Sequence, residues 1–230
     1  EIDYTLDGET HPIRFQMREH RFIDLEPRID LYIAGNGPRL QALAGEMADG
    51  LITALPRGGT IAGAMDNVRR GAASSGRTLP ASFHTSAMVN VALLEPGEAA
   101  NSERVLSQWG AAAITGLHYL VAQHLEFGTE PPPYAQGIWD AYLAWLNEAP
   151  PEVRHQRLHN SHYSFLDPEE ARFITPELLT GSCIIGEPDA VIEQLREREA
   201  DGLQQVMLYP PLKTQYRTIE DFAEQIIERM

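Results

Sequence analysis

The sequence has very little cysteine: Cys183 is the single thiol in 230 residues. One thiol excludes an internal disulfide and any metal site built from several thiolates, and it fits a reducing compartment. Cys183 lies in the apolar run of residues 182–185, where a cysteine usually packs as a small hydrophobe. We therefore predict a core position for Cys183 and no nucleophilic role.

Basic residues are also scarce, since 18 Lys and Arg stand against 33 Asp and Glu and give a formal net charge of -15. Binding to a phosphate backbone or an anionic membrane depends on Lys and Arg, so we predict neither partner. No apolar run approaches the roughly 20 residues of a membrane span, and no signal-peptide pattern opens the chain. These absences predict a soluble, cytoplasmic protein.

The composition that is present is that of a globular protein. Hydrophobic residues make up 43% of the chain, which is enough to bury the core of one sizeable domain. We therefore treat residues 1–230 as a single domain. The chain opens with Glu1 and runs directly into an alternating strand, and on this basis we expect that further sequence precedes it.

The first part of the chain alternates strands and helices. Residues 1–27 form a predicted β-hairpin, one face covered, around Asp7-Gly8, followed by a lead-in. The predicted region 28–95 begins within a strand over 27–34, which is followed after Pro38 by a helix-like stretch with Leu40, Leu43, Ala44 and Met47 on one face. A second strand over 49–54, a helix over about 61–75 and a strand near 83–94 come next. This order is a βαβ unit that is extended by one more repeat.

The second part is helical and then returns to alternation. Residues 96–173 contain many apolar residues interrupted by proline clusters, which predicts a helical insertion that can cover a cleft. Residues 174–230 form terminal βα units, with a helix over 188–200, a strand over 205–209 and a last helix from Thr218. Strands that are apolar throughout predict a parallel sheet buried on both faces. About four such strands are found, too few to close an eight-stranded barrel.

The strongest local signal is the turn Gly35-Asn36-Gly37, where a strand ends and a helix begins at once. Such a turn can direct backbone N–H groups and the positive end of a helix dipole at an anion. Glycines also permit close approach of a ligand to the backbone. The alternative is an ordinary tight βα turn, and the residues alone leave both interpretations open. Arg39 is either a phosphate contact or a solvated first-turn residue.

A family resemblance covers this turn. Residues 31–52 read LYIAGNGPRLQALAGEMADGLI, which is an apolar strand, a Gly-x-Gly-Pro turn, a helix with Ala-Gly-Glu, and Ala-Asp-Gly before the next strand. The stretches ITPELL at 174–179, GEPDAVI at 186–192 and GLQQVMLYPP at 202–211 follow in the same order. This arrangement resembles the luciferase-like monooxygenases and their F420-dependent relatives, and it covers most of residues 28–228.

The resemblance implies an α/β fold of the TIM-type (β/α)8 barrel class, seen here as its C-terminal part with a helical insertion. It implies FMN or F420 as cofactor, without separating the two. The phosphate contacts would come from Ala34, Gly35, Asn36 and Gly37, with Thr53 and Ala54 near the same pocket. The residues that contact the reactive ring in this family come largely from the first four barrel strands, which the chain does not show.

Histidines in the insertion are the weaker candidates for chemistry. His159 and His162 are possible substrate-pocket or acid–base groups, because histidine titrates near neutral pH. His155 and His159 have the i, i+4 spacing of a helical metal pair, but no carboxylate pair or cysteine supports them and we predict no metal. An ordinary structural role stays open for each of these histidines. The acidic run 167–170 is interpreted as a solvated helix start.

The function predicted from these features is that of a flavin- or F420-dependent oxidoreductase or monooxygenase acting on a small organic substrate. One alternative is a non-enzymatic flavin-binding protein or degenerate half-barrel. Another is an α/β module that uses the Gly35 turn for a different phosphorylated ligand. A truncated barrel exposes apolar edges, so we also expect a homodimer.

Overall fold

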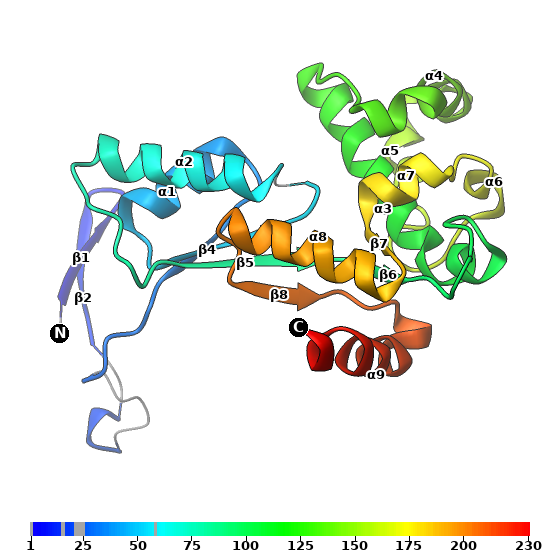
Figure 1. Ribbon diagram of the computed structural model, residues 1–230. Helices are drawn as coiled ribbons and strands as arrows, with labels where there is room; N and C mark the ends of the chain where they lie inside the picture. The colour runs from blue at the N-terminus through cyan, green and yellow to red at the C-terminus, as the bar shows by residue number, and fades with distance from the viewer. Residues whose placement is uncertain (1, 15–16, 21–25, 58) are drawn as a thin grey trace. The chain divides into compact units, whose positions relative to one another are not determined.

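The computed structural model describes residues 2–14, 17–20, 26–57 and 59–230. These residues fall into two units, one ending at Leu31 and the other running from Tyr32 to Met230, and each is described by itself (Figure 1).

The first unit contains the predicted hairpin. Strands β1 (Ile2–Leu6) and β2 (Glu9–Ile13) pair antiparallel. Asp7 and Gly8 connect them with φ values of 52° and 85°, the left-handed backbone that a tight hairpin turn requires. Every residue of both strands is exposed, so the prediction that one face is covered is wrong for this structure. Two strands alone supply no second layer to pack on either face. A short 3-10 turn, η1 (Arg18–His20), follows.

The second unit is built on a parallel sheet with strand order β3-β4-β5-β8. Its strands are β3 (Tyr32–Ala34), β4 (Gly50–Ala54), β5 (His84–Val89) and β8 (Gln205–Leu208). A second parallel pair joins β6 (Val91–Leu93) to β7 (Ile184–Gly186). The α/β class and the parallel sheet are therefore confirmed, and within the described residues the sheet is open. The first predicted strand is shorter than expected, because only its last three residues reach β4.

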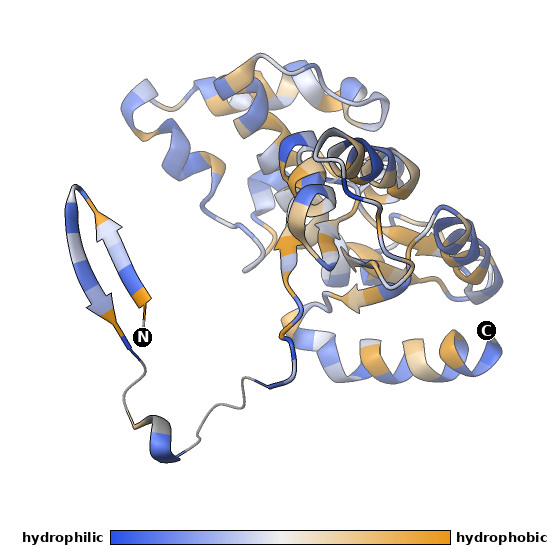
Figure 2. Cartoon of the chain, turned by 90° about the vertical axis from the view of Figure 1, so that its left-hand side faces the viewer, coloured by the Kyte–Doolittle hydropathy of each residue, from blue (hydrophilic) through white to orange (hydrophobic). Residues whose placement is uncertain are grey.

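Helices connect these strands. In chain order they are α1 (Pro38–Met47), α2 (Ile61–Ser74), α3 (Glu103–Phe127), α4 (Pro133–Asn147), η2 (Pro151–Val153), α5 (Arg154–Leu158), α6 (Pro168–Ala171), α7 (Pro176–Ser182), α8 (Pro188–Ala200), η3 (Leu212–Thr214), α9 (Gln215–Gln225) and η4 (Ile227–Arg229). Helices α3 to α6 lie within residues 96–173, the stretch predicted to be a helical insertion and called the insertion below. Helix α9 carries hydrophobic and hydrophilic residues along its length (Figure 2) and buries Phe222.

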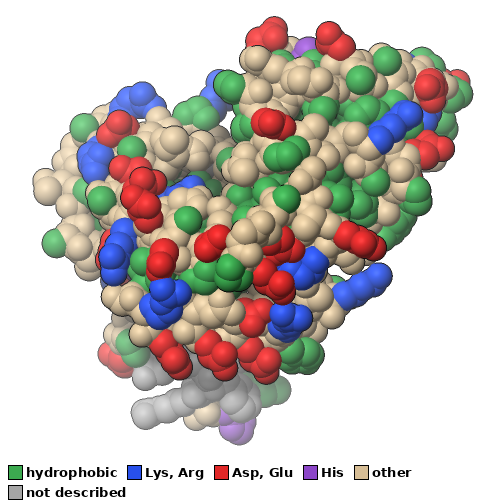
Figure 3. Space-filling view, turned by 45° about the vertical axis from the view of Figure 1, so that its right-hand side comes forward, with side chains coloured by type: hydrophobic (Ala, Val, Ile, Leu, Met, Phe, Trp, Pro, Cys, Tyr) green, Lys and Arg blue, Asp and Glu red, His purple; other side chains and the backbone are tan. Residues whose placement is uncertain are grey.

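The helices and strands enclose two hydrophobic cores. The first lies between the sheet and its helices and includes Leu51, Val68 and Ile226, each completely buried. The second lies inside the insertion and includes Trp139 and Trp145. Helix α7 also packs there through Leu178 and Leu179, so the insertion's core extends beyond residue 173, its predicted last residue. The face drawn in Figure 3 carries acidic side chains with basic ones between them.

Glu98 connects the end of β6 to the start of α3. Its carboxylate accepts hydrogen bonds from the Arg104 guanidinium, from the Ser102 hydroxyl at 2.5 Å and from the Glu95 backbone N–H at 2.9 Å. Arg104 also donates to the Leu93 carbonyl at 2.9 Å. The bond from Arg104 lowers the pKa of Glu98 to about 2, against the opposing effect of burial.

We expect Glu98→Gln to reduce stability in a pH-dependent way. The folded pKa is depressed, so the carboxylate stabilises the fold above its unfolded pKa of about 4.3 and loses this effect as pH falls toward 2. At pH 7 the variant should lose on the order of 1–3 kcal/mol. Urea unfolding at pH 7 and at pH 3 measures the difference in unfolding free energy between the wild type and Glu98→Gln, which should be smaller at pH 3. An equal difference at both pH values contradicts the assignment.

Candidate functional site

The predicted cofactor residues lie at the carboxyl ends of the parallel strands. Because β3, β4 and β5 run in the same direction, their last residues, Ala34, Ala54 and Val89, lie toward one edge of the sheet. Ligands of open parallel sheets bind outside this edge. This edge is therefore the candidate ligand-binding region of the sheet.

The turn after β3 is fastened to the end of β4. The backbone N–H of Gly35 donates to the Ile52 carbonyl at 2.9 Å. The side-chain oxygen of Asn36 accepts from the Ala54 backbone N–H at 2.8 Å and from the Thr53 hydroxyl at 3.3 Å. All of the predicted cofactor-binding residues are thus brought together. The side chains of Asn36 and Thr53 are hydrogen-bonded to each other, and this bond helps to hold the shape of the turn.

The two glycines of the turn have different surroundings. A Cβ atom on buried Gly35 would lie 2.5 Å from the Leu40 Cβ, whereas a Cβ on exposed Gly37 would meet no atom within 4 Å. Gly35 is therefore required by the internal packing of the turn. Gly37 leaves open space above the backbone.

Helix α1 begins at this open position without a side-chain cap. Its N-cap is Gly37, and among the described residues no side-chain cap bonds to this end of the helix. Thr60, Ser102 and Thr175 cap α2, α3 and α7 through their hydroxyl oxygens, whereas α4 and α8, like α1, begin without a side-chain cap. The first N–H groups of a helix lack intrahelical partners and carry the positive end of the dipole. The start of α1 can accordingly accept an anion.

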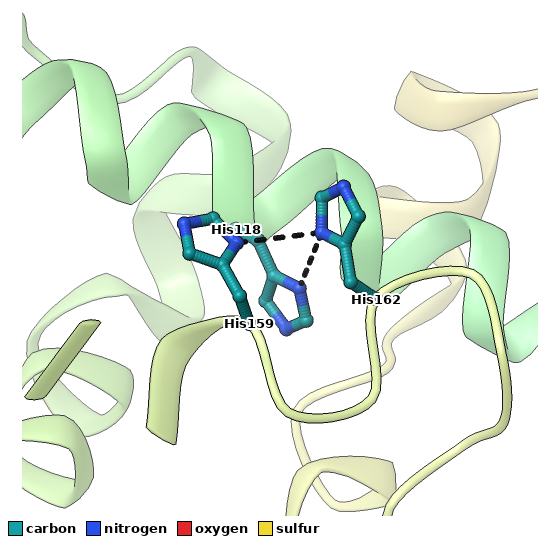
Figure 4. A group of neighbouring side chains, drawn as sticks. All are labelled: His118, His159 and His162. Carbon is teal, nitrogen blue, oxygen red and sulfur yellow. Dashed lines mark hydrogen bonds between the residues drawn. The ribbon is translucent and has the colours of Figure 1, made fainter. Parts of the chain in front are cut away.

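A second group of side chains lies in the insertion, where His118, His159 and His162 converge (Figure 4). The Nδ1 atom of His162 is 3.4 Å from Nδ1 of His118 and 3.4 Å from Nδ1 of His159. His118 comes from the middle of α3 and is fully buried, whereas His159 follows α5 and is exposed. His155 is exposed and lies outside this group, so the i, i+4 pair considered from the sequence is not the pair that the structure forms.

The buried carboxylate of Glu170 is hydrogen-bonded to His118, the buried member of the cluster. Glu170 is 1% exposed and accepts hydrogen bonds from His118 Nε2, the Tyr142 hydroxyl and the Ser161 hydroxyl, each at 2.7 Å. The prediction that the whole acidic run is solvated is wrong for Glu170. It holds for Glu169, which is exposed, and for Asp167, whose side chain caps α6.

The environment shifts several pKa values around the cluster. Burial, followed by the charges of neighbouring histidines, lowers the pKa of both His159 and His162. Burial raises the pKa of Glu170, but hydrogen bonds from His118, Ser161 and Tyr142 outweigh it and leave that pKa below its usual range. At neutral pH the carboxylate is consequently ionised and the two outer imidazoles are neutral.

Ring contacts link the histidine cluster to the strand edge. His162 Nε2 lies 3.1 Å from the Tyr119 hydroxyl, and the Arg57 guanidinium, just after β4, stacks 4.0 Å from the Tyr119 ring. The ring of Tyr163 contacts that of Tyr209, just after β8, at 5.0 Å. The cluster therefore borders the loops that leave the carboxyl ends of β4 and β8.

Cys183 is confirmed as a core residue, because it is buried and burial raises the pKa of its thiol to about 12.

None of the helices in the described part of the chain combines the length and apolar character of a bilayer-spanning helix. Sequence reasoning missed His118 and Glu170. The only signal for them was that a histidine and a glutamate occur in a largely helical, apolar stretch. His118 and Glu170 are 52 residues apart, so this signal does not pair them.

Parallel strands that alternate with helices, with a glycine turn at the carboxyl end of β3, form part of a TIM-type α/β barrel. The sequence matches the family of luciferase-like monooxygenases over residues 3–205, and the chain belongs to that family.

Two solved structures show the same fold. A coenzyme F420-dependent tetrahydromethanopterin reductase from Methanopyrus kandleri is 17% identical with a TM-score of 0.55, and the match covers 87% of this chain and 51% of that one. An F420-dependent secondary alcohol dehydrogenase, solved with an F420–acetone adduct, is 15% identical with a TM-score of 0.51 and coverages of 98% and 55%. The chain thus spans about half the length of these proteins.

Proposed function

We propose that this chain is the cofactor-phosphate half of a flavin- or F420-dependent oxidoreductase or monooxygenase that acts on a small organic substrate. FMN or F420 is the proposed cofactor. Family membership supports the class, and the two structural neighbours carry F420 in their names. When bound, the flavin or deazaflavin ring would supply hydride transfer or oxygen activation.

The observation that carries the proposal is the open, uncapped start of α1 at Gly37. A phosphate placed there would accept hydrogen bonds from backbone N–H groups and gain from the helix dipole. Asn36 would keep this turn in shape through its bonds to Thr53 and Ala54. Ala34 and Gly35 would end the strand so that the turn lies at the sheet edge.

His159 and His162 are the proposed acid–base groups on the substrate side. Neither side chain is buried. His162 also contacts Tyr119, on whose ring Arg57 after β4 stacks, and Tyr163, which contacts Tyr209 after β8. Neutral imidazole can accept a proton at neutral pH. The homodimer stays a prediction from the exposed apolar edges of the open sheet, such as Tyr32 on β3.

We expect Gly37→Val to weaken cofactor binding about 10–100-fold, because the side chain fills the space where a phosphate would approach and removes one or two charge-assisted hydrogen bonds. The new side chain starts in open space, and the N-cap backbone is extended, with φ -102°. The fold should therefore survive. Fluorescence quenching in separate titrations of FMN and F420 against the intact protein measures the affinity.

Gly137→Val is the matched control, because Gly137 also meets no atom within 4 Å but lies in α4, away from the turn. It should leave cofactor affinity unchanged. Gly35→Val is unsuitable, since its Cβ would press on Leu40. Equal affinity of Gly37→Val and wild type would overturn the phosphate assignment. If the wild type binds neither cofactor, the turn serves another phosphorylated ligand or none.

A further inference from the structure

The three imidazoles of His118, His159 and His162 turn the same ring atom toward one another (Figure 4). The Nδ1 atoms are separated by 3.4 Å in two of the three pairs, and all of the ligand atoms lie within 4.8 Å. Tetrahedral zinc with Zn–N bonds of about 2.0–2.1 Å separates its nitrogen ligands by roughly 3.3–3.4 Å. Two of the observed separations already have this value.

Glu170 fixes the proton of His118. The Glu170 oxygen that accepts from the Tyr142 hydroxyl also lies 2.7 Å from Nε2 of His118. The ring proton therefore belongs on Nε2, and the Nδ1 lone pair faces the cluster. A proton on Nδ1 of His162 could be donated to one neighbour and would leave the other lone pair facing it unmatched. A cation placed between the rings satisfies all three nitrogens at once.

The surroundings also have the pattern of a metal site's outer layer. Metal-binding histidines usually place their second nitrogen against a carboxylate, carbonyl or other oxygen. His118 uses Glu170 in this way, and His162 uses the Tyr119 hydroxyl at 3.1 Å. Glu170 is itself held by Tyr142 and Ser161, so its oxygens are engaged and it serves as the neutralising charge and not as a ligand.

We propose that His118, His159 and His162 bind a divalent first-row transition metal such as Zn²⁺ through their Nδ1 atoms. In the metal-bound protein His159 and His162 are ligands, and the acid–base role proposed above belongs to the metal-free protein. Imidazole nitrogens suit zinc, whereas Mg²⁺ and Ca²⁺ take oxygen ligands. Three ligands leave a fourth tetrahedral position for water or another small ligand. Exposed His159 places that position at the surface.

The metal would join two segments that are distant along the chain. His118 lies in the middle of α3, and His162 lies in the turn between α5 and α6, 44 residues later. The same turn carries Tyr163, whose ring contacts Tyr209 after β8. Metal binding would therefore fix the segment that borders the carboxyl edge of the sheet.

The test is a calorimetric titration of the intact, untagged protein with Zn²⁺. The visible absorption spectrum of the protein after addition of Co²⁺ tests independently for tetrahedral coordination. We expect one ion per chain. Glu170→Gln should weaken binding by about 10–100-fold, and loss of a ligand in His162→Ala should weaken it further. His162 is partly exposed, so this variant should fold, which circular dichroism checks.

His155→Ala is the matched control, because His155 is an exposed histidine of the same region outside the cluster. It should bind Zn²⁺ as the wild type does. Absence of binding by the wild type overturns the proposal, as does equal binding by wild type and His162→Ala. No flavin or F420 is present in this experiment, so its outcome is independent of the proposed cofactor function.

Discussion

Glu170→Ala is expected to destabilise the protein by about 3–5 kcal/mol, because it removes a buried, hydrogen-bonded charge and leaves its donors without an acceptor. Those donors are His118 Nε2 and the hydroxyls of Tyr142 and Ser161. Each donor residue is 1% exposed or less, so water cannot readily replace the carboxylate. Burial and the adjacent carboxylate raise the pKa of Tyr142, which keeps its hydroxyl protonated as a donor.

Urea unfolding in the presence of a chelator measures this loss separately from any metal effect. Glu169→Ala is the matched control, since Glu169 is the neighbouring residue on α6 but is exposed, with bonds to Trp145 and Arg157. Solvent screens exposed pairs, so the loss for Glu169→Ala should be much smaller. A loss for Glu170→Ala no larger than that of Glu169→Ala would show that Glu170 is not a buried acceptor in solution.

The sequence predicted the glycine turn and the strand ends beside it well, because their signals are local. The turn at Gly35 and Gly37, the helix that follows and the strand ending at Ala54 are contiguous, so hydrophobic periodicity and glycine chemistry suffice to place them. The parallel direction of the strands then brings the turn and Thr53 to the same edge. Only the role of Asn36 as an internal bridge needed coordinates.

The histidine cluster could not be predicted in the same way. Glu170 belongs to an acidic run typical of a solvated helix start, and this interpretation holds for the residue before it. Its burial depends on α3 and α4, which deliver His118 and Tyr142 from 52 and 28 residues away. Such contacts follow from how the insertion's helices pack, and no periodicity within one segment encodes them.

Close packing of α1 on α2 was another feature without a local signal. Gly45 of α1 and Gly71 of α2 lie in helix interiors, where glycine is intrinsically unfavourable by about 1 kcal/mol relative to alanine. A Cβ on Gly71 would lie 1.9 Å from the Ala42 carbonyl oxygen, and one on Gly45 would lie 1.9 Å from that of Val68. The two backbones therefore touch at both glycines.

Gly71→Ala is expected to cost about 3 kcal/mol or more, because a methyl group cannot enter the contact unless the helices separate, and rigid backbone has no rotamer to relieve the overlap. Gly137→Ala in α4 is the matched control, since its methyl would meet nothing within 4 Å and should stabilise the helix by up to about 1 kcal/mol. Urea unfolding of both variants should thus give shifts of opposite sign; a neutral or stabilising Gly71→Ala contradicts the contact.

Gly71→Ala should also affect the proposed cofactor site. Helix α1 begins at Gly37, so separating it from α2 displaces the turn whose shape Asn36 maintains. We therefore expect Gly71→Ala to weaken FMN or F420 binding under conditions where the protein is still folded, although Gly71 lies in a different helix from the turn. Gly137→Ala should leave the affinity unchanged. A folded Gly71→Ala protein with wild-type affinity would show that the turn holds its shape through β4 alone.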